Sequence, residues 1–315
     1  MVQPFLKWAG GKRQLYKEIF TRLPVSFGEG EFREYVEPFV GGGAVLFEMF
    51  NRGKIDSAVV LDCNIDLILC YSVVKYHVED LIEHLTELKK SYHAKTTYEL
   101  RKNFYWELRT AFNINIGESN TSWPVHKKVL HAARFIMLNK LCFNGLFRVN
   151  SEGTFNVPPS DLTDKAIFST SNLKDVSDLL QNVKIMHGDY SESSKHIHPN
   201  TFVYFDPPYR PLTKTSFVAY SKSEFTDKEQ GDLADLCIDL SPDVKLMVSN
   251  SNPKSVTPSD DFFDRIYPMT TGFRHHPVQA NRSISSQGSS RTGTGELIIV
   301  NYSTYEQSRL DRKTE

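Results

Sequence analysis

The tetrapeptide at residues 206–209, which reads DPPY, is the segment of this 315-residue chain that most directly suggests chemistry. Two consecutive prolines fix φ and restrict the residue before them, so the carbonyl oxygens of Asp206 and Pro207 are held in place. Fixed acceptors suit an amino group on a planar ring, because hydrogen bonds to its hydrogens favour pyramidalisation of a nitrogen whose lone pair is delocalised. Tyr209 offers a ring that stacks on the same planar group. The alternative interpretation is a rigid proline turn without a chemical role.

A glycine turn at residues 39–43, which reads FVGGG, is the second candidate site. Glycines let a backbone approach a ligand closely, and the helix that follows offers amide donors at its start. Asp62, at the end of the next apolar run, can accept hydrogen bonds from ribose hydroxyls. The alternatives are a left-handed turn that binds nothing and an aspartate that caps a helix or lies on the surface.

Two other nucleotide-binding motifs are excluded because key positions carry the wrong residues. The dinucleotide fingerprint needs a third glycine where Leu46 stands. A P-loop that ends in Gly11-Lys12 would need glycine at Leu6 and serine or threonine at Arg13.

Composition narrows the class of protein without indicating its role. The net charge of -1 and the pI near 6.8 give no global footprint for binding a polyanion. The four cysteines form no CxxC pair, and His275-His276 has no third ligand at metal spacing, so we expect no metal site and a reducing compartment. No stretch approaches the roughly 20 apolar residues that cross a bilayer, and the protein is expected to be cytoplasmic without a membrane partner.

Apolar runs at the following positions predict the strands that position both candidate sites: 34–40, 58–61, 183–186, 201–205, 245–248 and 296–300. Helical spacing marks residues 44–50 and 232–240. Residues 65–140 are predicted to be mostly helical, without a convincing strand. A Ser/Gly-rich stretch at 283–295 is predicted to be a loop between elements. The pattern therefore predicts an α/β sheet interrupted by a helical insertion, with the DPPY segment at the carboxyl end of a strand, where open α/β sheets bind ligands.

Seven blocks resemble, in this order, the DNA adenine methylases of the Dam type, and the resemblance runs from about residue 5 to 302. The blocks are residues 5–12 (FLKWAGGK), 37–43 (EPFVGGG), 62–64 (DCN), 143–148 (FNGLFR), 155–158 (FNVP), 188–190 (GDY) and 206–209 (DPPY).

The resemblance implies a Rossmann-like, S-adenosylmethionine-dependent methyltransferase sheet with an inserted, mainly helical target-recognition domain. Residues 1–65 and 169–302 are expected to form the catalytic domain, 66–168 the insertion, and 303–315 a polar tail. Catalytic roles are expected for Asp206, Pro207 and Tyr209. The residues expected to bind the cofactor are Trp8, Lys12, Phe39, Gly41, Gly43, Asp62, Asp189 and Asp206, and those expected to contact target bases are Lys7, Leu146, Arg148 and Pro158.

Local charge in the predicted insertion is consistent with a nucleic-acid partner. Residues 119–151 contain no acidic side chain, and their basic residues are Lys127, Lys128, Arg134, Lys140 and Arg148. A solvated helix face is the alternative interpretation.

The expected activity is methylation of N6 of a flipped adenine in double-stranded DNA, with S-adenosylmethionine as donor, no metal and no covalent enzyme intermediate. GATC is the expected site, although Ser151 and Glu152 stand where relatives often carry a basic residue. A restriction endonuclease is a possible partner in the same system. The alternatives are methylation of RNA or of a protein side-chain amide, and a DNA-binding relative without activity.

Overall fold

A computed structural model describes residues 1–29, 32–118, 122–160, 167–212, 225–280 and 294–304. Its strands form a seven-stranded sheet in the order β3-β2-β1-β4-β5-β7-β6. Their bounds are β1 Glu34–Glu37, β2 Ser57–Asp62, β3 Val183–His187, β4 Thr201–Phe205, β5 Lys245–Ser251, β6 Arg274–Ala280 and β7 Thr294–Val300. β1 pairs in parallel with β2 and β4, and β4 pairs in parallel with β5, whereas β7 is antiparallel to both β5 and β6.

The chain divides into two compact units. Unit 1 comprises Met1–Gly11, Val40–Asn51 and Leu61–Gly188, and unit 2 comprises Lys12–Phe39, Arg52–Val60 and Asp189–Glu315. The domain boundaries predicted from the sequence, with an insertion at 66–168, stay a prediction.

Every strand predicted from an apolar run is present, and one strand was not predicted. β6 was not predicted because it is mostly polar and contains Pro277, and both features are unusual for a strand. A proline is tolerated there because β6 lies at the edge of the sheet and, among the described strands, pairs only with β7. β7 begins at Thr294, so the loop predicted up to Gly295 ends earlier than expected, and most of that loop lies outside the described residues.

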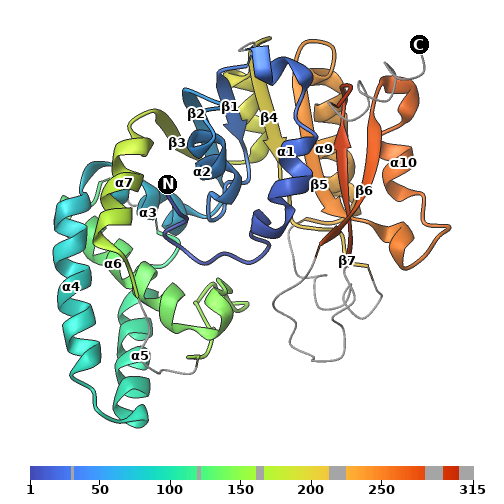
Figure 1. The fold of residues 1–315 in the computed structure, drawn as a ribbon. Helices are drawn as coiled ribbons and strands as arrows, with labels where there is room; N and C mark the ends of the chain where they lie inside the picture. The colour runs from blue at the N-terminus through green and yellow to red at the C-terminus, as the bar shows by residue number, and fades with distance from the viewer. Residues whose placement is uncertain (30–31, 119–121, 161–166, 213–224, 281–293, 305–315) are drawn as a thin grey trace. The chain divides into compact units, whose positions relative to one another are not determined.

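In unit 2, helix α9 (Asp227–Leu240) contributes a buried face to the core. The predicted helix at 232–240 is confirmed, and it begins earlier because Thr226 and Glu229 form a capping box at its start. The core joins this helix to β4, β5 and β7, which are labelled in Figure 1. Its buried side chains include Val203, Phe205, Leu233, Ala234, Cys237, Leu246, Val248 and Ile299. The other helices of unit 2 are α1 (Tyr16–Thr21), α10 (Phe262–Ile266) and the 3₁₀ turns Lys12–Leu15, Val25–Glu29, Tyr190–His196, Pro253–Ser255 and Met269–Thr271.

Unit 1 is mainly helical, as predicted for residues 65–140. Its helices are α2 (Ala44–Asn51), α3 (Ile65–Tyr76), α4 (Val78–His93), α5 (Tyr98–Asn113), α6 (Val125–Leu141), α7 (Thr170–Leu180) and the 3₁₀ turn Phe143–Gly145. α4 and α5 both pack on α6, whose inward face is fully buried (Figure 1). α6 is therefore the central helix of this unit.

A buried side-chain hydrogen bond fixes α6 to α3. His131 Nε2 lies 2.8 Å from Asp66 Oδ1, and both side chains are almost fully buried. Asp66 Oδ2 also accepts a hydrogen bond from the Gly117 amide after α5. Three segments thus meet at one carboxylate.

The described helices are too short or too polar to cross a membrane. Of the predicted polar tail, only Ser303 and Thr304 lie within the described residues, and Thr304 is buried in a bridge to Pro24.

Candidate active site and recognition segment

Asp206 follows β4 directly, and every residue of β4 is buried. Its Oδ2 atom lies 2.7 Å from Lys12 Nζ, and the two side chains are 18% and 7% exposed. The other carboxylate oxygen, Oδ1, is buried and has no hydrogen-bond partner among the described residues. A buried acceptor without a partner is costly, so such an atom indicates a site that receives a donor.

The pKa of Asp206 is set by opposing effects of its surroundings. Burial raises the pKa of this carboxyl to about 6, with Glu296 adding to the increase and the Lys12 ammonium opposing it. Asp206 is therefore ionised at neutral pH and becomes protonated as the pH falls through about 6.

Tyr209 is held at both ends of its side chain. Lys12 Nζ lies 4.6 Å from the ring centroid, and the phenol donates a 2.9 Å hydrogen bond to Glu296 Oε2. Burial, together with Asp206 and Glu296, raises the pKa of Tyr209 well above its usual range, so the side chain is a neutral donor. Lys12 thus contacts two of the three residues predicted to be catalytic, Asp206 and Tyr209.

Glu296 was not predicted as a site residue. It lies on β7, and only the antiparallel pairing of β7 with β5 places it beside this segment of unit 2. Its sole sequence signal is an acidic residue at the start of an otherwise apolar strand.

Phe39 belongs to an aromatic cluster in unit 2. Its ring stacks on Tyr190 at a centroid distance of 5.4 Å and meets Phe225 edge-on at 5.7 Å. Asp189, immediately before Tyr190, is exposed and caps the following 3₁₀ turn through a 3.0 Å hydrogen bond from the Ser191 amide. Asp189 therefore has a structural role as the cap of this turn. Its expected contact with the cofactor stays a prediction.

The glycine turn of unit 1 is tied to Asp62. Asp62 Oδ2 accepts a 3.0 Å hydrogen bond from the Gly41 amide, and its Oδ1 accepts one of 2.9 Å from Asn64. Burial raises the pKa of Asp62, and these two hydrogen bonds oppose the increase. Asn64, rather than Asp62, caps α3. Each carboxylate oxygen retains a lone pair for a further donor.

Trp8 packs directly against this turn. A Cβ atom added at Gly41 would lie 2.7 Å from Trp8 Cδ1, and one at Gly42 would lie 2.9 Å from Trp8 Cβ. The indole also stacks on Phe147 at a centroid distance of 6.0 Å. Trp8 therefore lies between the glycine turn and the segment that carries Leu146 and Arg148, all within unit 1.

Asn139, at the end of α6, joins two segments predicted to contact DNA. Its side chain accepts a 2.8 Å hydrogen bond from the Lys7 amide and donates to the carbonyls of Lys7 (2.7 Å) and Gly145 (3.0 Å). Gly145 has φ = 66° and its Cα faces Lys7 so closely that no other residue fits there. The Lys7 side chain itself is exposed.

Residues 149–155, which include Ser151 and Glu152, form a hairpin-like turn. Val149 and Phe155 form a bridge, and Asn150 accepts hydrogen bonds from the Glu152 and Thr154 amides inside the turn. On the first arm, exposed Arg148 donates a 2.8 Å hydrogen bond to Asn156 on the second.

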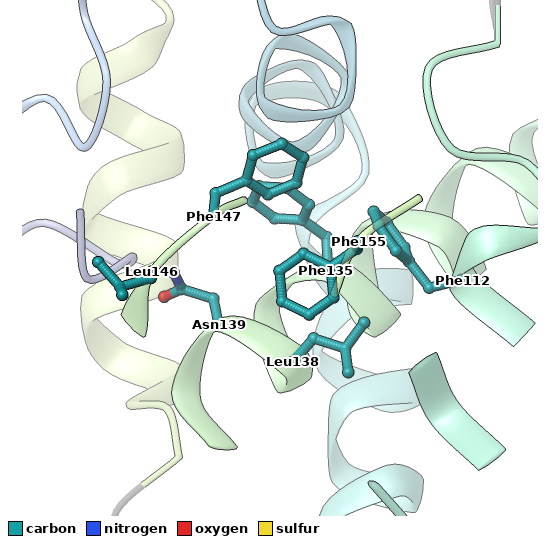
Figure 2. Close-up of a pocket in the computed structure, with 7 residues that line it drawn as sticks. All are labelled: Phe112, Phe135, Leu138, Asn139, Leu146, Phe147 and Phe155. Carbon is teal, nitrogen blue, oxygen red and sulfur yellow. The ribbon is translucent and has the colours of Figure 1, made fainter. Parts of the chain in front are cut away.

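Pro158 is linked to the same segment, since its carbonyl accepts a 2.9 Å hydrogen bond from the Phe143 amide. Lys7, Leu146, Arg148 and Pro158 thus belong to one hydrogen-bonded region of unit 1. Behind it lies a small cavity with a mostly aromatic lining, shown in Figure 2 and formed by Phe112, Phe135, Leu138, Asn139, Leu146, Phe147 and Phe155.

The basic side chains of residues 119–151 differ in exposure. Lys127, which lies over the Trp123 ring at 3.9 Å, and Arg134 are both half-buried, whereas Arg148 is exposed. Burial lowers the pKa of Arg134. Arg148 is therefore the member of this set with the greatest access to a partner.

Comparison with known proteins gives consistent matches over nearly the whole chain. Residues 8–284 match the family described as D12 class N6 adenine-specific DNA methyltransferase. The chain is 44% identical over 304 residues to the type II methyltransferase M.MjaIII of Methanocaldococcus jannaschii, covering 96% of this chain and 99% of that protein. It is 35% identical to the type II methyltransferase M1.LlaDCHI of Lactococcus lactis subsp. cremoris, covering 96% of each chain. It is 32% identical to the DNA adenine methylase of Salmonella typhi, covering 94% of each.

Proposed function

Because the chain belongs to the D12 class of N6 adenine-specific DNA methyltransferases, we propose that Asp206 and the Pro207 carbonyl receive the N6 amino group of an adenine flipped out of duplex DNA. The Rossmann-like methyltransferase fold and the enzyme class expected from the resemblance are those of this family. The observation that carries the proposal is the buried Oδ1 atom of Asp206, which has no hydrogen-bond partner in the part of the chain that the structure describes and lies next to a backbone fixed by two prolines.

The family implies S-adenosylmethionine as the methyl donor. This group supplies an electrophilic methyl when bound. Gly41 and Gly43 both have positive φ, and the space that a Cβ would take is filled by Trp8 at Gly41 and by Tyr71 and Phe47 at Gly43. The backbone of the turn is therefore fixed by packing, and we propose that its amides face the cofactor. Asp62 keeps lone pairs for hydroxyl donors, and we propose it as the acceptor for the ribose.

Asp206 acts as an acceptor in this proposal. One of its oxygens is fixed by Lys12, so the orientation of the free oxygen is set before the substrate arrives. A hydrogen bond from the N6 amine to a buried carboxylate stabilises the positive charge that develops on nitrogen as the methyl is transferred. The same carboxylate can then take up the proton that the methylated amine releases.

Tyr209 orients the base. Its ring is fixed by Lys12 on one face and by the hydrogen bond to Glu296 at its hydroxyl, so stacking on adenine costs little further ordering. We propose that the transfer is direct and in-line, without a covalent enzyme intermediate.

Transfer of labelled methyl groups tests this function. Enzyme, labelled S-adenosylmethionine and duplex DNA are incubated, and the DNA is digested to nucleosides. The expected product is labelled 6-methyladenine, and label in 4-methylcytosine would contradict the base assignment. RNA and a protein acceptor in parallel reactions distinguish the alternative substrates, and both should remain unlabelled.

For recognition, we propose that Lys7, Leu146, Arg148 and Pro158 contact the bases around the target adenine, with GATC as the expected site. The exposed guanidinium of Arg148 suits the two acceptors that guanine presents in the major groove. Because two of the relatives are named type II methyltransferases, we further propose a cognate restriction endonuclease as partner in the same system.

Mapping of methylated adenines tests the recognition site. DNA from a host without adenine methylation, sequenced after expression of the enzyme, should show 6-methyladenine in GATC alone. Methylation in a different, uniform context would refute GATC while leaving the reaction unaffected.

A further inference from the structure

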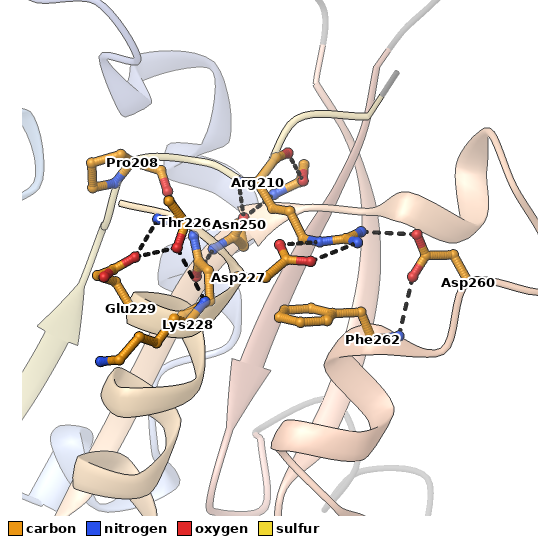
Figure 3. Close-up of polar contacts among 11 residues, drawn as sticks. Pro208, Arg210, Thr226, Asp227, Lys228, Glu229, Asn250, Asp260 and Phe262 are labelled. Atoms are coloured by element: carbon orange, nitrogen blue, oxygen red, sulfur yellow. Dashed lines mark hydrogen bonds and ion pairs between the residues drawn. The ribbon is translucent and has the colours of Figure 1, made fainter. Parts of the chain in front are cut away.

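The backbone that follows the two prolines is held by a chain of two buried amide side chains. Gln230 on α9 donates a 2.8 Å hydrogen bond from Nε2 to the Pro208 carbonyl. Gln230 Oε1 in turn accepts a 3.0 Å hydrogen bond from Asn250 Nδ2 on β5. Gln230 is 1% exposed and Asn250 is 0% exposed, so neither side chain has access to bulk water. Figure 3 shows Asn250 beneath the segment from Pro208 to Arg210.

The chain continues from Asn250 back to the same segment. Asn250 Oδ1 accepts a 3.0 Å hydrogen bond from the Arg210 amide and one of 2.9 Å from the Ser251 amide. Ser251 Oγ donates a 2.6 Å hydrogen bond to the Arg210 carbonyl. The side-chain oxygen and nitrogen of Gln230 and of Asn250 therefore each have a hydrogen-bond partner within unit 2.

The direction of the hydrogen bonds is set by groups that cannot change role. Backbone N–H groups only donate, so the atom of Asn250 that faces Arg210 must be its oxygen. Its nitrogen then faces Gln230 and requires an oxygen there, which leaves the Gln230 nitrogen to donate to Pro208. The Pro208 carbonyl can only accept, and the chain is consistent at both ends.

The two backbone groups at the ends of this chain flank Tyr209. The Pro208 carbonyl belongs to the peptide plane before Tyr209, and the Arg210 amide belongs to the plane after it. Because Pro207 and Pro208 have no N–H group, carbonyl oxygens are the main-chain hydrogen-bonding groups that they offer. A donor such as Gln230 is therefore the means by which the protein can fix this turn through hydrogen bonds to the prolines' backbone.

We propose that Gln230 and Asn250 are positioning residues for methyl transfer, which hold the backbone of Tyr209 so that its ring and the Pro207 carbonyl keep their places during the reaction. The inference rests on the function proposed above. Neither side chain is required to touch the adenine or the cofactor.

The side chain of Arg210 anchors the end of the segment separately. Its guanidinium pairs with Asp227 at 2.7 Å and Asp260 at 2.8 Å and lies over the Phe262 ring (Figure 3). Because this anchor does not involve Gln230 or Asn250, loss of the amide chain should loosen the turn without releasing Arg210.

Kinetics of Gln230→Met and Asn250→Leu test the proposal. Both substitutions keep a similar side-chain size and remove the hydrogen bonds. We expect kcat per folded enzyme to fall about 100-fold, with KM for S-adenosylmethionine and for duplex DNA nearly unchanged, because a displaced turn misaligns the reacting groups rather than weakening binding. The double variant should lose no more than the worse single variant, since both break one chain.

Asn301→Leu is the matched control. Asn301 is also an asparagine of unit 2 that holds backbone on both sides, through hydrogen bonds to the Ser241 and Val244 carbonyls and from the Leu246 amide. It lies away from the DPPY segment in sequence and in its contacts. Asn301→Leu should lower Tm about as much as Gln230→Met and Asn250→Leu do. Its kcat per folded enzyme should stay within about threefold of that of the unsubstituted enzyme.

Three results would overturn the inference: unchanged kcat in both amide variants, an equal loss of kcat in Asn301→Leu, or losses that add in the double variant. An unsubstituted enzyme that forms no 6-methyladenine would instead refute the proposed function, and the inference with it.

Discussion

Trp8 in unit 1 and Asp206 in unit 2 are both predicted site residues, yet they are held by different forces. Trp8 is fixed by close packing, because it lies so near Gly41 and Gly42 that a Cβ atom at either position would clash with it. Its indole also stacks on Phe147. Asp206 is fixed by charge, through a largely buried ion pair with Lys12. A surface that binds a ligand by close backbone approach needs small residues, whereas one that stabilises developing charge needs preorganised polar groups.

The same contrast extends to the surroundings. In unit 1, backbone atoms of Lys7 and Gly145 are joined by Asn139, and the exposed groups project from that frame. In unit 2, the DPPY segment and the residue after it are held by buried polar side chains from α9 and β5 and by the half-buried Glu296 of β7. Substitutions in unit 1 should therefore affect binding and recognition, and substitutions in unit 2 should affect the chemical step.

Asp206→Ala is expected to have the largest effect. It removes the acceptor and leaves Lys12 without this partner, so methyl transfer should fall by roughly 10³-fold or more, whereas DNA affinity should change little. Single-turnover methylation and a DNA-binding titration measure the two quantities. Turnover equal to that of the unsubstituted enzyme would remove Asp206 from the mechanism.

Gly41→Ala should mainly impair cofactor binding. The backbone there has φ = 47°, and the new methyl group would lie 2.7 Å from the Trp8 ring. We expect the Kd for S-adenosylmethionine, measured by calorimetry, to rise and the free energy of unfolding to fall by about 1–3 kcal/mol.

Gly117→Ala is the matched control in the same unit. Gly117 also has a positive φ, of 69°, but no atom of the described residues lies within 4 Å of the position its Cβ would take. This variant should bear the backbone strain alone and keep cofactor affinity. Equal loss of affinity in both variants would show that close packing on Trp8 is irrelevant.

Arg148→Ala should weaken sequence discrimination more than overall affinity. Loss of a guanidinium that reads a base costs about 1–3 kcal/mol on the cognate duplex and much less on a scrambled one. The ratio of kcat/KM on the two duplexes measures this difference. Lys127→Ala is the control, because the Lys127 ammonium already contacts the Trp123 ring and Glu118 within the protein. A fall of equal size on both duplexes for Arg148→Ala would assign it to the phosphate backbone instead.

Activity should depend on pH through Asp206. Burial raises the pKa of this carboxyl to about 6. Only the ionised form has both oxygens free of a proton, so that one can accept from Lys12 and the other from the adenine amine. Single-turnover rates should therefore be constant near neutral pH and fall about tenfold per unit below that pKa. Asp206→Asn cannot titrate, and its lower rate should lack this inflection. A profile without an inflection near 6 in the unsubstituted enzyme would contradict an essential Asp206 carboxylate.

Much of the fold followed from local pattern, because apolar runs bounded by polar residues mark buried strands wherever they occur. β6 did not follow, since Pro277 and the neighbouring histidines make an edge strand resemble a loop. The family resemblance indicated Lys12 and Asp206 separately, and the structure shows that they form an ion pair. Glu296, Gln230 and Asn250 could not be predicted, because their proximity to the DPPY segment depends on how β5, β7 and α9 are arranged.

A crystal structure of the enzyme with duplex DNA and a non-reactive S-adenosylmethionine analogue would show where the target adenine binds. We expect an adenine outside the duplex, with its N6 about 3 Å from Asp206 Oδ1 and from the Pro207 carbonyl oxygen. An adenine bound with N6 turned away from both oxygens would contradict this expectation.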